Sequence, residues 1–256
     1  MGGLVASEET SMSEGRFHGQ VVLVTGSSMG IGEATARHFA REGATVVVNS
    51  ARSVDEGRAV AADIGGHYVQ ANVADADGPQ TLISATLDTC GRLDVLVNNA
   101  GTTRVIPHHD LASPTLDVWR EIFEVNVFAT WAMSVAAVAH LKETRGSIVN
   151  VSSVAGLRQT GSSIPYAASK AALNHVTTLL AKVVGPEVRV NAVAPGLIDT
   201  PWTEDWDVVR GFVQQIAPLK RTGEPDDVAD LILALAGSPY VTGQVVAVDG
   251  GLTLSV

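Results

Sequence analysis

The chain has 256 residues, of which 46% are hydrophobic, and this is enough to form the buried core of one α/β domain. Its net charge of −10, from 27 acidic against 17 basic residues, disfavours broad electrostatic binding to nucleic acid or to an anionic membrane. Cys90 is the single cysteine, which excludes an intrachain disulfide and a thiolate-rich zinc site. We therefore expect a single soluble domain in the reducing cytoplasm.

The first residues of the chain differ in character from the rest. Residues 1–16 are small and polar around Leu4 and Val5, and they lack the long apolar run of a signal peptide or a membrane span. They are predicted to form a flexible tail. Residues 17–256 are predicted to form a single catalytic domain.

Short β-branched runs alternate with longer stretches of helical pattern along the domain. The predicted strands cover residues 20–25, 44–49, 67–71, 94–98, 146–151, 188–193 and 244–248. The predicted crossover helices cover residues 30–42, 53–64, 77–91, 115–144 and 164–184. This rhythm predicts an α/β fold, a doubly wound parallel sheet of seven strands with helices on both faces.

One stretch interrupts the rhythm. Residues 195–224 contain no strand candidate, but they contain three prolines together with Trp202, Trp206 and Phe212. An insertion at the carboxyl end of a strand often covers the substrate, so a lid is predicted around residues 197–222. The alternative is a packed surface excursion.

A glycine-rich turn joins the first predicted strand to the first predicted helix. It contains Gly26, Gly30 and Gly32, spaced Gly-x-x-x-Gly-x-Gly. Glycines let the backbone approach a pyrophosphate, and the free amides at a helix start point at the anion. The turn therefore indicates binding of a dinucleotide.

A tyrosine and a lysine stand one helical turn apart in the fifth predicted helix. Tyr166 precedes Lys170 by four residues, and Ser153 lies thirteen residues before Tyr166. A nearby ammonium favours the phenolate, so the pKa of Tyr166 is expected to be lowered and its phenol to act as general acid or base. The alternative is an amphipathic pair on a solvated turn.

Together these motifs resemble the classical short-chain dehydrogenases/reductases over nearly the whole chain from Val21. The resemblance includes the segments 98–101 (Asn-Asn-Ala-Gly), 195–196 (Pro-Gly), 241–244 (Val-Thr-Gly-Gln) and 249–251 (Asp-Gly-Gly). It implies a Rossmann-type fold and hydride transfer between a nicotinamide cofactor and a carbonyl or secondary alcohol. The implied catalytic residues are Asn126, which anchors a water, Ser153, which hydrogen-bonds the substrate oxygen, Tyr166, and Lys170, which also holds the nicotinamide ribose.

The resemblance also implies which residues contact the cofactor. They follow the ends of successive strands and comprise Gly26, Ser28, Met29, Gly30, Ile31, Gly32, Ser50, Arg52, Asn72, Val73, Asn99, Ala100, Gly101, Tyr166, Lys170, Pro195, Gly196, Ile198 and Thr200.

The end of the second predicted strand bears on the choice of cofactor. Ser50 stands where NAD-dependent enzymes carry an acid, and Arg52 is close enough to pair with a 2′-phosphate, which favours NADP(H) over NAD(H). Met29 offers no charge to a phosphate, and Arg52 could instead be a surface cation paired with Asp55 or Glu56.

Predicted substrate contacts lie between the catalytic group and the lid. They are Ser153, Leu157, Tyr166, Trp202 and Trp206, a mostly apolar set that suits a carbonyl or alcohol on a hydrophobic body. The chain is generally similar to 3-oxoacyl-carrier-protein reductases. An acidic carrier protein would need a cationic rim near the active site. Lys182 could contribute to it, but the segment 185–187 (Gly-Pro-Glu) that follows carries an acid, so a stand-alone carbonyl reductase or alcohol dehydrogenase is preferred.

Other classes of function are weaker. Ser153 lacks the Gly-x-Ser-x-Gly context of a hydrolase nucleophile. His108 and His109, beside Asp110, are expected to form a solvated loop and no metal site. A non-catalytic NAD(P)-sensing module remains an alternative, because the fold alone does not imply catalysis.

The end of the chain suggests self-association. The apolar runs 244–248 and 252–256 would leave a hydrophobic edge exposed on a monomer. A homotetramer is therefore expected, in line with the family. The expected partners are a small-molecule carbonyl or alcohol and further copies of the chain, without nucleic acid or membrane.

Overall fold

The computed structural model describes residues 15–255, and residues 1–14 of the predicted tail lie outside the described residues. The folded unit includes Gly15 and Arg16, which the prediction assigned to the tail. The Arg16 backbone N–H donates to Glu42 Oε2 at 2.9 Å. A Cβ on Gly15 would clash with the Glu42 carbonyl, so the backbone is packed closely there.

Seven strands form one sheet in the order β3-β2-β1-β4-β5-β6-β7, and every neighbouring pair is parallel. This confirms the predicted fold class. The strands are β1 (Val21–Val24), β2 (Thr45–Ser50), β3 (His67–Gln70), β4 (Val95–Asn98), β5 (Ser147–Val151), β6 (Arg189–Pro195) and β7 (Val245–Val248).

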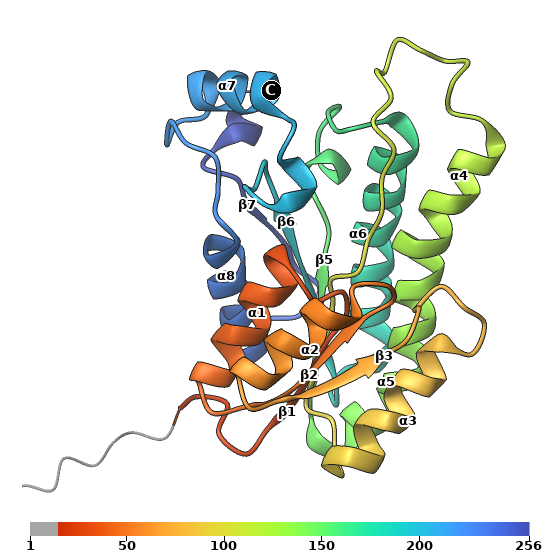
Figure 1. Ribbon diagram of the computed structural model, residues 1–256, viewed down its shortest axis with the longest axis vertical. Coiled ribbons are helices and arrows are strands. Elements are labelled where there is room, and N and C mark those ends of the chain that lie inside the picture. Colours follow the sequence, from red (N-terminus) through yellow and green to blue (C-terminus); the bar gives the residue numbers. More distant parts are fainter. Residues whose placement is uncertain (1–14, 256) are drawn as a thin grey trace, which may run out of the picture.

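Helices cover both faces of the sheet (Figure 1). Helices α1, α2 and α8 lie on one face of the sheet, and helices α3, α5 and α6 lie on the other. The helices are α1 (Gly30–Arg41), α2 (Val54–Asp63), α3 (Gly78–Cys90), α4 (Leu116–Phe123), α5 (Thr130–Thr144), α6 (Ile164–Val184), α7 (Asp207–Ile216) and α8 (Pro225–Gly237).

Alternating side chains of the buried strands pack into two separate hydrophobic cores, one on each face of the sheet. Val22 and Val24 of β1 pack on the α1 and α8 side, whereas Val21 and Leu23 pack on the α3 and α5 side. A strand that is buried on both faces needs apolar residues at consecutive positions. This is why the sequence shows continuous β-branched runs.

The helix predicted over 115–144 is interrupted. A π-helical turn, η1 (Glu124–Ala129), separates α4 from α5 and leaves Asn126 fully buried. Such turns insert one residue into a helix and are frequent at functional sites. Periodicity over 30 residues does not detect one inserted residue.

Helix α8 was not predicted. It begins after Glu224, whose side chain accepts from the Asp227 backbone while the Asp227 side chain accepts from the Glu224 N–H. This capping box, with Pro225 at the first helical position, is a sequence signal that the prediction passed over.

The continuous span Leu116–Thr144 is long and apolar enough to cross a membrane by length and composition. In the fold, Met133, Ala137 and Leu141 of this span pack into the core beneath the sheet. Its apolar character is therefore used in part for the interior of the domain.

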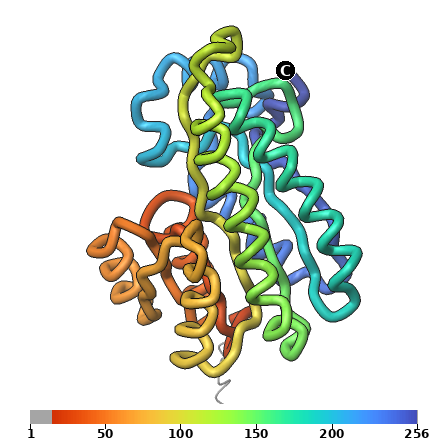
Figure 2. Tube along the Cα trace, turned by 90° about the vertical axis from the view of Figure 1, so that its right-hand side faces the viewer, coloured from red at the N-terminus to blue at the C-terminus, as the bar shows by residue number. Residues whose placement is uncertain are grey.

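The predicted lid contains a short 3₁₀ turn, η3 (Pro201–Thr203), and helix α7. Figure 2 shows, from a second direction, that α7 and the loop after β4 lie at the same end of the molecule. This is the end at which the parallel strands finish.

Candidate active site

The carboxyl ends of β1, β4, β5 and β6 border one cavity of about 970 Å³. The chain leaves β1 toward β2 on one side, and β4 lies on the other, so the cavity sits where the strand order reverses. Ligands of open α/β sheets bind at this point. Every residue predicted to contact the cofactor lines the cavity.

The glycine turn has the backbone geometry of a phosphate cradle. Gly26 and Gly30 have φ values of 61° and 59°, in the left-handed region that favours glycine. A Cβ at Gly32 would clash with the Gly26 carbonyl and with Asn99 Nδ2. Helix α1 starts at Gly30 with no side-chain cap on its first amides, so those N–H groups are available to an anion.

Two asparagines hold this turn in place. Asn99 Nδ2 donates to the carbonyls of Thr25 and Gly26, both at 2.9 Å, and Asn49 Oδ1 accepts from the Gly26 N–H at 3.2 Å. The two side chains come from the ends of β2 and β4, the strands on either side of β1. The conformation of the turn is therefore fixed by side chains from outside it.

The opposite end of the cavity is suited to an adenosine. Ser50 Oγ donates to the Ser53 carbonyl at 2.8 Å and lies 2.8 Å from the Tyr68 hydroxyl, a neighbour that sequence reasoning missed. Arg52 is exposed at the cavity and forms no ion pair with any residue in 15–255. Asn72 donates to Asp75 at 2.7 Å, and Val73 is buried beside it.

The catalytic candidates come from β5, its following turn and α6. Ser153 caps the 3₁₀ turn η2 (Val154–Gly156), with its Oγ accepting from the Ala155 N–H at 3.1 Å. Tyr166 and Lys170 share one face of α6, and Lys170 Nζ lies 5.8 Å from the centre of the Tyr166 ring. Nζ donates to the Val151 carbonyl at 2.9 Å, so β5 fixes the ammonium near the phenol.

Burial decides the protonation of this pair. It raises the pKa of Tyr166 above the ordinary value of 10, and the nearby Ser153 hydroxyl acts in the opposite direction with a smaller effect. Burial lowers the pKa of Lys170 to about 8, because a charge is poorly solvated there. Tyr166 is partly exposed, and its exposed surface lines the cavity.

This corrects the expectation that Lys170 lowers the pKa of Tyr166. The expectation used the helical spacing alone, but Lys170 is buried and the packing around the Tyr166 phenol reduces its solvation enough to raise its pKa. The Tyr166 phenol is therefore protonated at neutral pH.

Asn126 is brought to the catalytic group without lining the cavity. Its Oδ1 accepts from the Thr102 N–H at 2.8 Å, and its Nδ2 donates to the Thr102 carbonyl and to Ser169 Oγ, both at 3.0 Å. These bonds tie the loop after β4 to α6. The predicted role in anchoring a water stays a prediction.

The substrate side of the cavity is mostly apolar. Trp202 and Trp206 line it as predicted, whereas Leu157 does not line it, because it ends the η2 turn outside the wall that Val154 and Ala155 form. Two further parts of the wall are the loop after β4, which sequence reasoning missed, and helix α7, which lies within the lid predicted around residues 197–222 but was not among the predicted substrate contacts. They contribute Thr103, Val105, Ile106, Pro107, His108, Val208, Val209, Phe212 and Val213.

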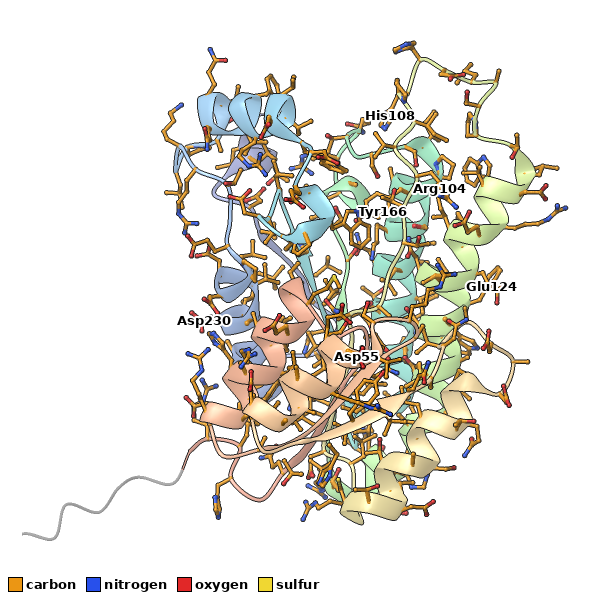
Figure 3. The ribbon with its side chains drawn as sticks, in the orientation of Figure 1. Asp55, Arg104, His108, Glu124, Tyr166 and Asp230 are labelled. Atoms are coloured by element: carbon orange, nitrogen blue, oxygen red, sulfur yellow. The ribbon has the colours of Figure 1, made fainter. Side chains whose placement is uncertain are left out.

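His108 is not the solvated side chain that was expected. It borders the cavity above Tyr166 on the loop after β4 (Figure 3), and its Nε2 is buried without a hydrogen-bond partner among the described residues. The signal that could have placed it is its position after the carboxyl end of a central strand. Within residues 15–255, no three His, Cys, Asp or Glu side chains come together as a metal-binding group.

Known proteins resemble the chain throughout the domain. A family model described as enoyl-(acyl carrier protein) reductase matches residues 26–253. "Granaticin polyketide synthase putative ketoacyl reductase 2" of Streptomyces violaceoruber is 54% identical over 239 residues, covering 91% of this chain and 96% of that protein. A 3-oxoacyl-[acyl-carrier-protein] reductase of Synechocystis is 42% identical over 245 residues, covering 92% and 97%.

The fold agrees with a solved structure of the same kind. A short-chain dehydrogenase/reductase of Caenorhabditis elegans, determined with cofactor, superposes with a TM-score of 0.84 at 33% identity, covering 94% of this chain and 97% of that one. The order of the motifs along the chain, the cavity that the glycine turn and the catalytic candidates both line, and these relatives lead to one assignment. The chain is an oxidoreductase of the short-chain dehydrogenase/reductase family.

Proposed function

We propose that the chain is an NADP(H)-dependent reductase that converts the ketone of a 3-oxoacyl-type substrate to a secondary alcohol. One observation carries the proposal: Ser153, Tyr166 and Lys170 share a single cavity with the glycine turn, and the wall beside them on the α7 side is mostly apolar. The names of the two curated relatives, both ketoacyl or 3-oxoacyl reductases, support this substrate class.

The residues at the end of β5 and in α6 divide the chemistry between them. Bound NADPH supplies the hydride. Tyr166 donates its phenolic proton to the carbonyl oxygen, and Ser153 Oγ hydrogen-bonds the same oxygen as negative charge develops there. Lys170, with its pKa near 8, stabilises the phenolate that Tyr166 becomes after giving up its proton.

The adenosine end supports the phosphorylated cofactor. Arg52 is exposed and free of ion pairs in the described part of the chain, so neither Asp55 nor Glu56 competes for its guanidinium. Guanidinium groups bind phosphate through paired N–H donors. Ser50 adds no negative charge that would repel the 2′-phosphate.

Docking of an acidic carrier protein would require cationic side chains near the active site. Lys182 stands 16 residues after Tyr166 on α6, which puts it about 24 Å away at a rise of 1.5 Å per residue. It therefore lies too far along α6 to contribute to a cationic rim around Tyr166. Arg158 is exposed after η2, and it donates to the carbonyls of Thr253 and Leu157.

Parallel turnover assays test the proposal. Acetoacetyl-CoA, ethyl 3-oxobutanoate and cyclohexanone are each offered with NADPH and with NADH while oxidation of the reduced cofactor is followed. Turnover of the 3-oxo compounds with NADPH supports the proposal. Turnover of cyclohexanone alone favours a stand-alone carbonyl reductase, and calorimetric NADPH binding without turnover favours the sensing module.

We also propose a homotetramer in the cytoplasm. Large apolar side chains are exposed along α4, η1, α5 and α6, namely Leu116, Phe128, Trp131, Val135, Leu179 and Val183. Leu254, near the end of the chain, is 82% exposed. Burial against further copies would remove this surface from water. Light scattering measures the mass directly, and a monomer would contradict the proposal.

A further inference from the structure

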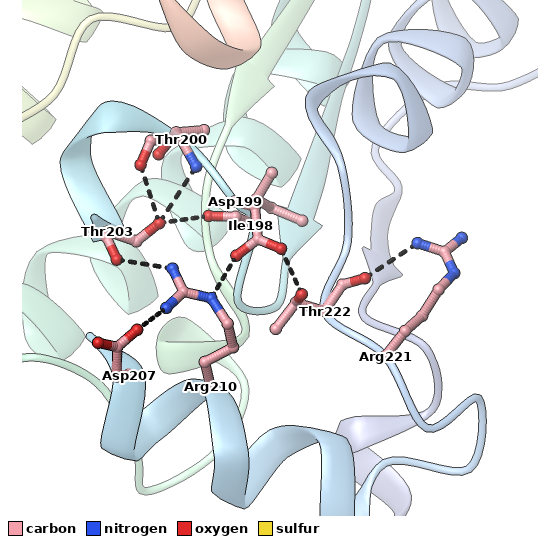
Figure 4. A network of polar contacts seen from close by, with 8 residues as sticks. All are labelled: Ile198, Asp199, Thr200, Thr203, Asp207, Arg210, Arg221 and Thr222. Carbon is pink, nitrogen blue, oxygen red and sulfur yellow. Dashed lines mark hydrogen bonds and ion pairs between the residues drawn. The ribbon is translucent and has the colours of Figure 1, made fainter. Parts of the chain in front are cut away.

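Arg210 of α7 is the centre of a polar network at the substrate side of the cavity (Figure 4). Its Nε donates to Asp199 Oδ1 at 2.9 Å, and its Nη2 donates to the Thr203 carbonyl at 3.1 Å. Its Nη1 donates to Asp207 Oδ1 at 2.5 Å. The first two bonds cross from α7 to the segment after β6, whereas the third stays within α7.

Asp199 is held on the side away from α7. Its N–H donates to the Gly223 carbonyl at 2.8 Å, and its Oδ2 accepts from Thr222 Oγ1 at 2.5 Å. The Thr222 hydrogen bond and the Arg210 guanidinium both keep the pKa of Asp199 below its ordinary value, so the carboxylate is charged at neutral pH. Asp199 therefore offers Arg210 a fixed, ionised acceptor.

Helix α7 has little apolar anchorage of its own. Val213 is its buried residue, and it joins Ala217 and Leu252 in a small cluster separate from both cores of the sheet. Val208 and Phe212 line the cavity and are 88% and 54% exposed. A helix with so few buried contacts depends more on its polar ties for its position.

The same ties reach the cofactor side. Thr203 Oγ1 donates to the Ile198 carbonyl at 2.7 Å and accepts from the Thr200 N–H at 3.2 Å. Thr200 in turn faces the glycine turn, because a Cβ at Gly30 would lie 3.3 Å from Thr200 Cγ2. Arg210 thus links the apolar wall of α7 to the segment Ile198–Thr200 at the nicotinamide end.

We propose that Arg210 and Asp199 are a positioning pair that couples the substrate wall to the cofactor segment, so that each ligand strengthens binding of the other. The proposal rests on NADP(H) and a 3-oxo compound occupying this cavity, as proposed above. A coupling between two ligands is reciprocal, and the residue that carries it need touch neither ligand.

The test uses a complex that cannot react, NADP⁺ together with the ketone ethyl 3-oxobutanoate. The dissociation constant of NADP⁺ is measured by calorimetry without the ester and with the ester at saturation. In the wild-type protein the ester is expected to tighten NADP⁺ about fivefold or more. Arg210→Met and Asp199→Asn are expected to bring this ratio close to one.

Two further variants separate positioning from general stability. Arg210→Lys keeps the charge but cannot span the acceptors with a planar fork, so an intermediate ratio is expected. Asp207→Ala removes the bond within α7, and it should leave the ratio at its wild-type value. Asp207 is the matched control because its side chain is 90% exposed and it contacts the same guanidinium.

Steady-state kinetics gives a second readout. Arg210→Met is expected to raise KM for the ester about tenfold, with a smaller fall in kcat, because α7 forms the substrate wall. The double variant Asp199→Asn with Arg210→Met should cost no more than the larger single change, since both remove one interaction. Melting curves show whether each variant is folded.

The outcomes are distinct. If the wild-type protein binds NADP⁺ and turns over the ester, but neither ligand strengthens binding of the other, the coupling proposal is overturned and the proposed function stands. A folded Arg210→Met variant with the wild-type ratio overturns the coupling proposal as well. Should Arg210→Met fail to fold, the same criterion applies to Asp199→Asn and Arg210→Lys. Wild-type protein that does not bind NADP⁺ contradicts the proposed function instead.

Discussion

The two halves of the cavity are built in different ways. The cofactor half consists of strand ends and the start of α1, where backbone atoms leave no room for a Cβ at Gly32. The substrate half consists of the loop after β4 and helix α7, where Val105 is 67% exposed and Val208 is 88% exposed. Its supporting cluster of buried residues is centred on Val213, Ala217 and Leu252.

The cofactor half has a backbone geometry that cannot vary, whereas the side-chain wall of the substrate half can vary. A cofactor held by backbone groups and braced asparagines needs the same main chain for every substrate. A wall of exposed apolar side chains can change its shape without the loss of a core contact. The predictions below test this contrast at the junction of the halves and then in each half.

The largest effect is expected where the halves meet. Tyr166→Phe removes the proton donor but keeps the ring, so kcat should fall by about 10²- to 10⁴-fold. NADPH affinity, measured by calorimetry, should change little. Tyr240→Phe is the matched control, because Tyr240 is fully exposed. Retained turnover in Tyr166→Phe would exclude Tyr166 as the acid.

Gly32→Ala tests the cofactor half. The added methyl group clashes with the Gly26 carbonyl and Asn99, so NADPH affinity should fall by about 100-fold or more, or the domain should lose about 1–3 kcal/mol of stability. Gly211→Ala in α7 is the control, since nothing lies within 4 Å of its added Cβ. Equal losses of NADPH affinity or stability in the two variants would contradict the proposed difference between the two halves of the cavity.

Lys170→Met tests the buried charge through pH. The pKa of Lys170 is about 8 in the folded protein against an ordinary value of 10.5, so the unfolded chain holds more protons between these values. The free energy of unfolding should therefore rise with pH in this window, by up to about 3 kcal/mol. Lys170→Met should lose that rise.

The measurement compares denaturant unfolding at pH 7.5 and pH 9.5. This range stays below the raised pKa of Tyr166, which lowers stability as pH increases above about 10. Lys182→Met, at the exposed far end of α6, is the control and should keep the wild-type rise. A rise that persists in Lys170→Met would assign it to another group.

Arg52→Ala tests the adenosine end with a smaller effect. Loss of a charged contact to the 2′-phosphate should raise KM for NADPH by about tenfold and leave KM for NADH unchanged. Arg41→Ala, exposed at the end of α1, is the control. Equal change for both cofactors would show that Arg52 does not read the phosphate.

Phe212→Ala tests the substrate half and should have the smallest effect on stability. Because Phe212 is 54% exposed, the variant should lose about 1 kcal/mol or less of stability while KM for a 3-oxo ester rises severalfold. Phe39→Ala gives the comparison, since Phe39 is fully buried and packs on Phe17 at 4.7 Å. It should cost about 3–5 kcal/mol.

Local patterns predicted much of the fold and half of the cavity. The seven strands and the glycine turn depend on contiguous residues, so their signals are present in short windows. The interrupted helix at Asn126, helix α8 and the wall formed by α7 were missed or described too coarsely. The η1 turn and the wall depend on distant packing partners, whereas α8 had a capping signal that was overlooked.

The sequence by itself determined the order of the elements, the turn that fits a dinucleotide and the phenol one helical turn from an ammonium. Only the tertiary structure decided the protonation of that pair, because burial of Tyr166 and Lys170 comes from elements far apart in the chain. It also decided how Arg210 joins α7 to Asp199. Desolvation and such long-range bonds depend on which segments meet in space, and residue spacing along the chain does not contain that information.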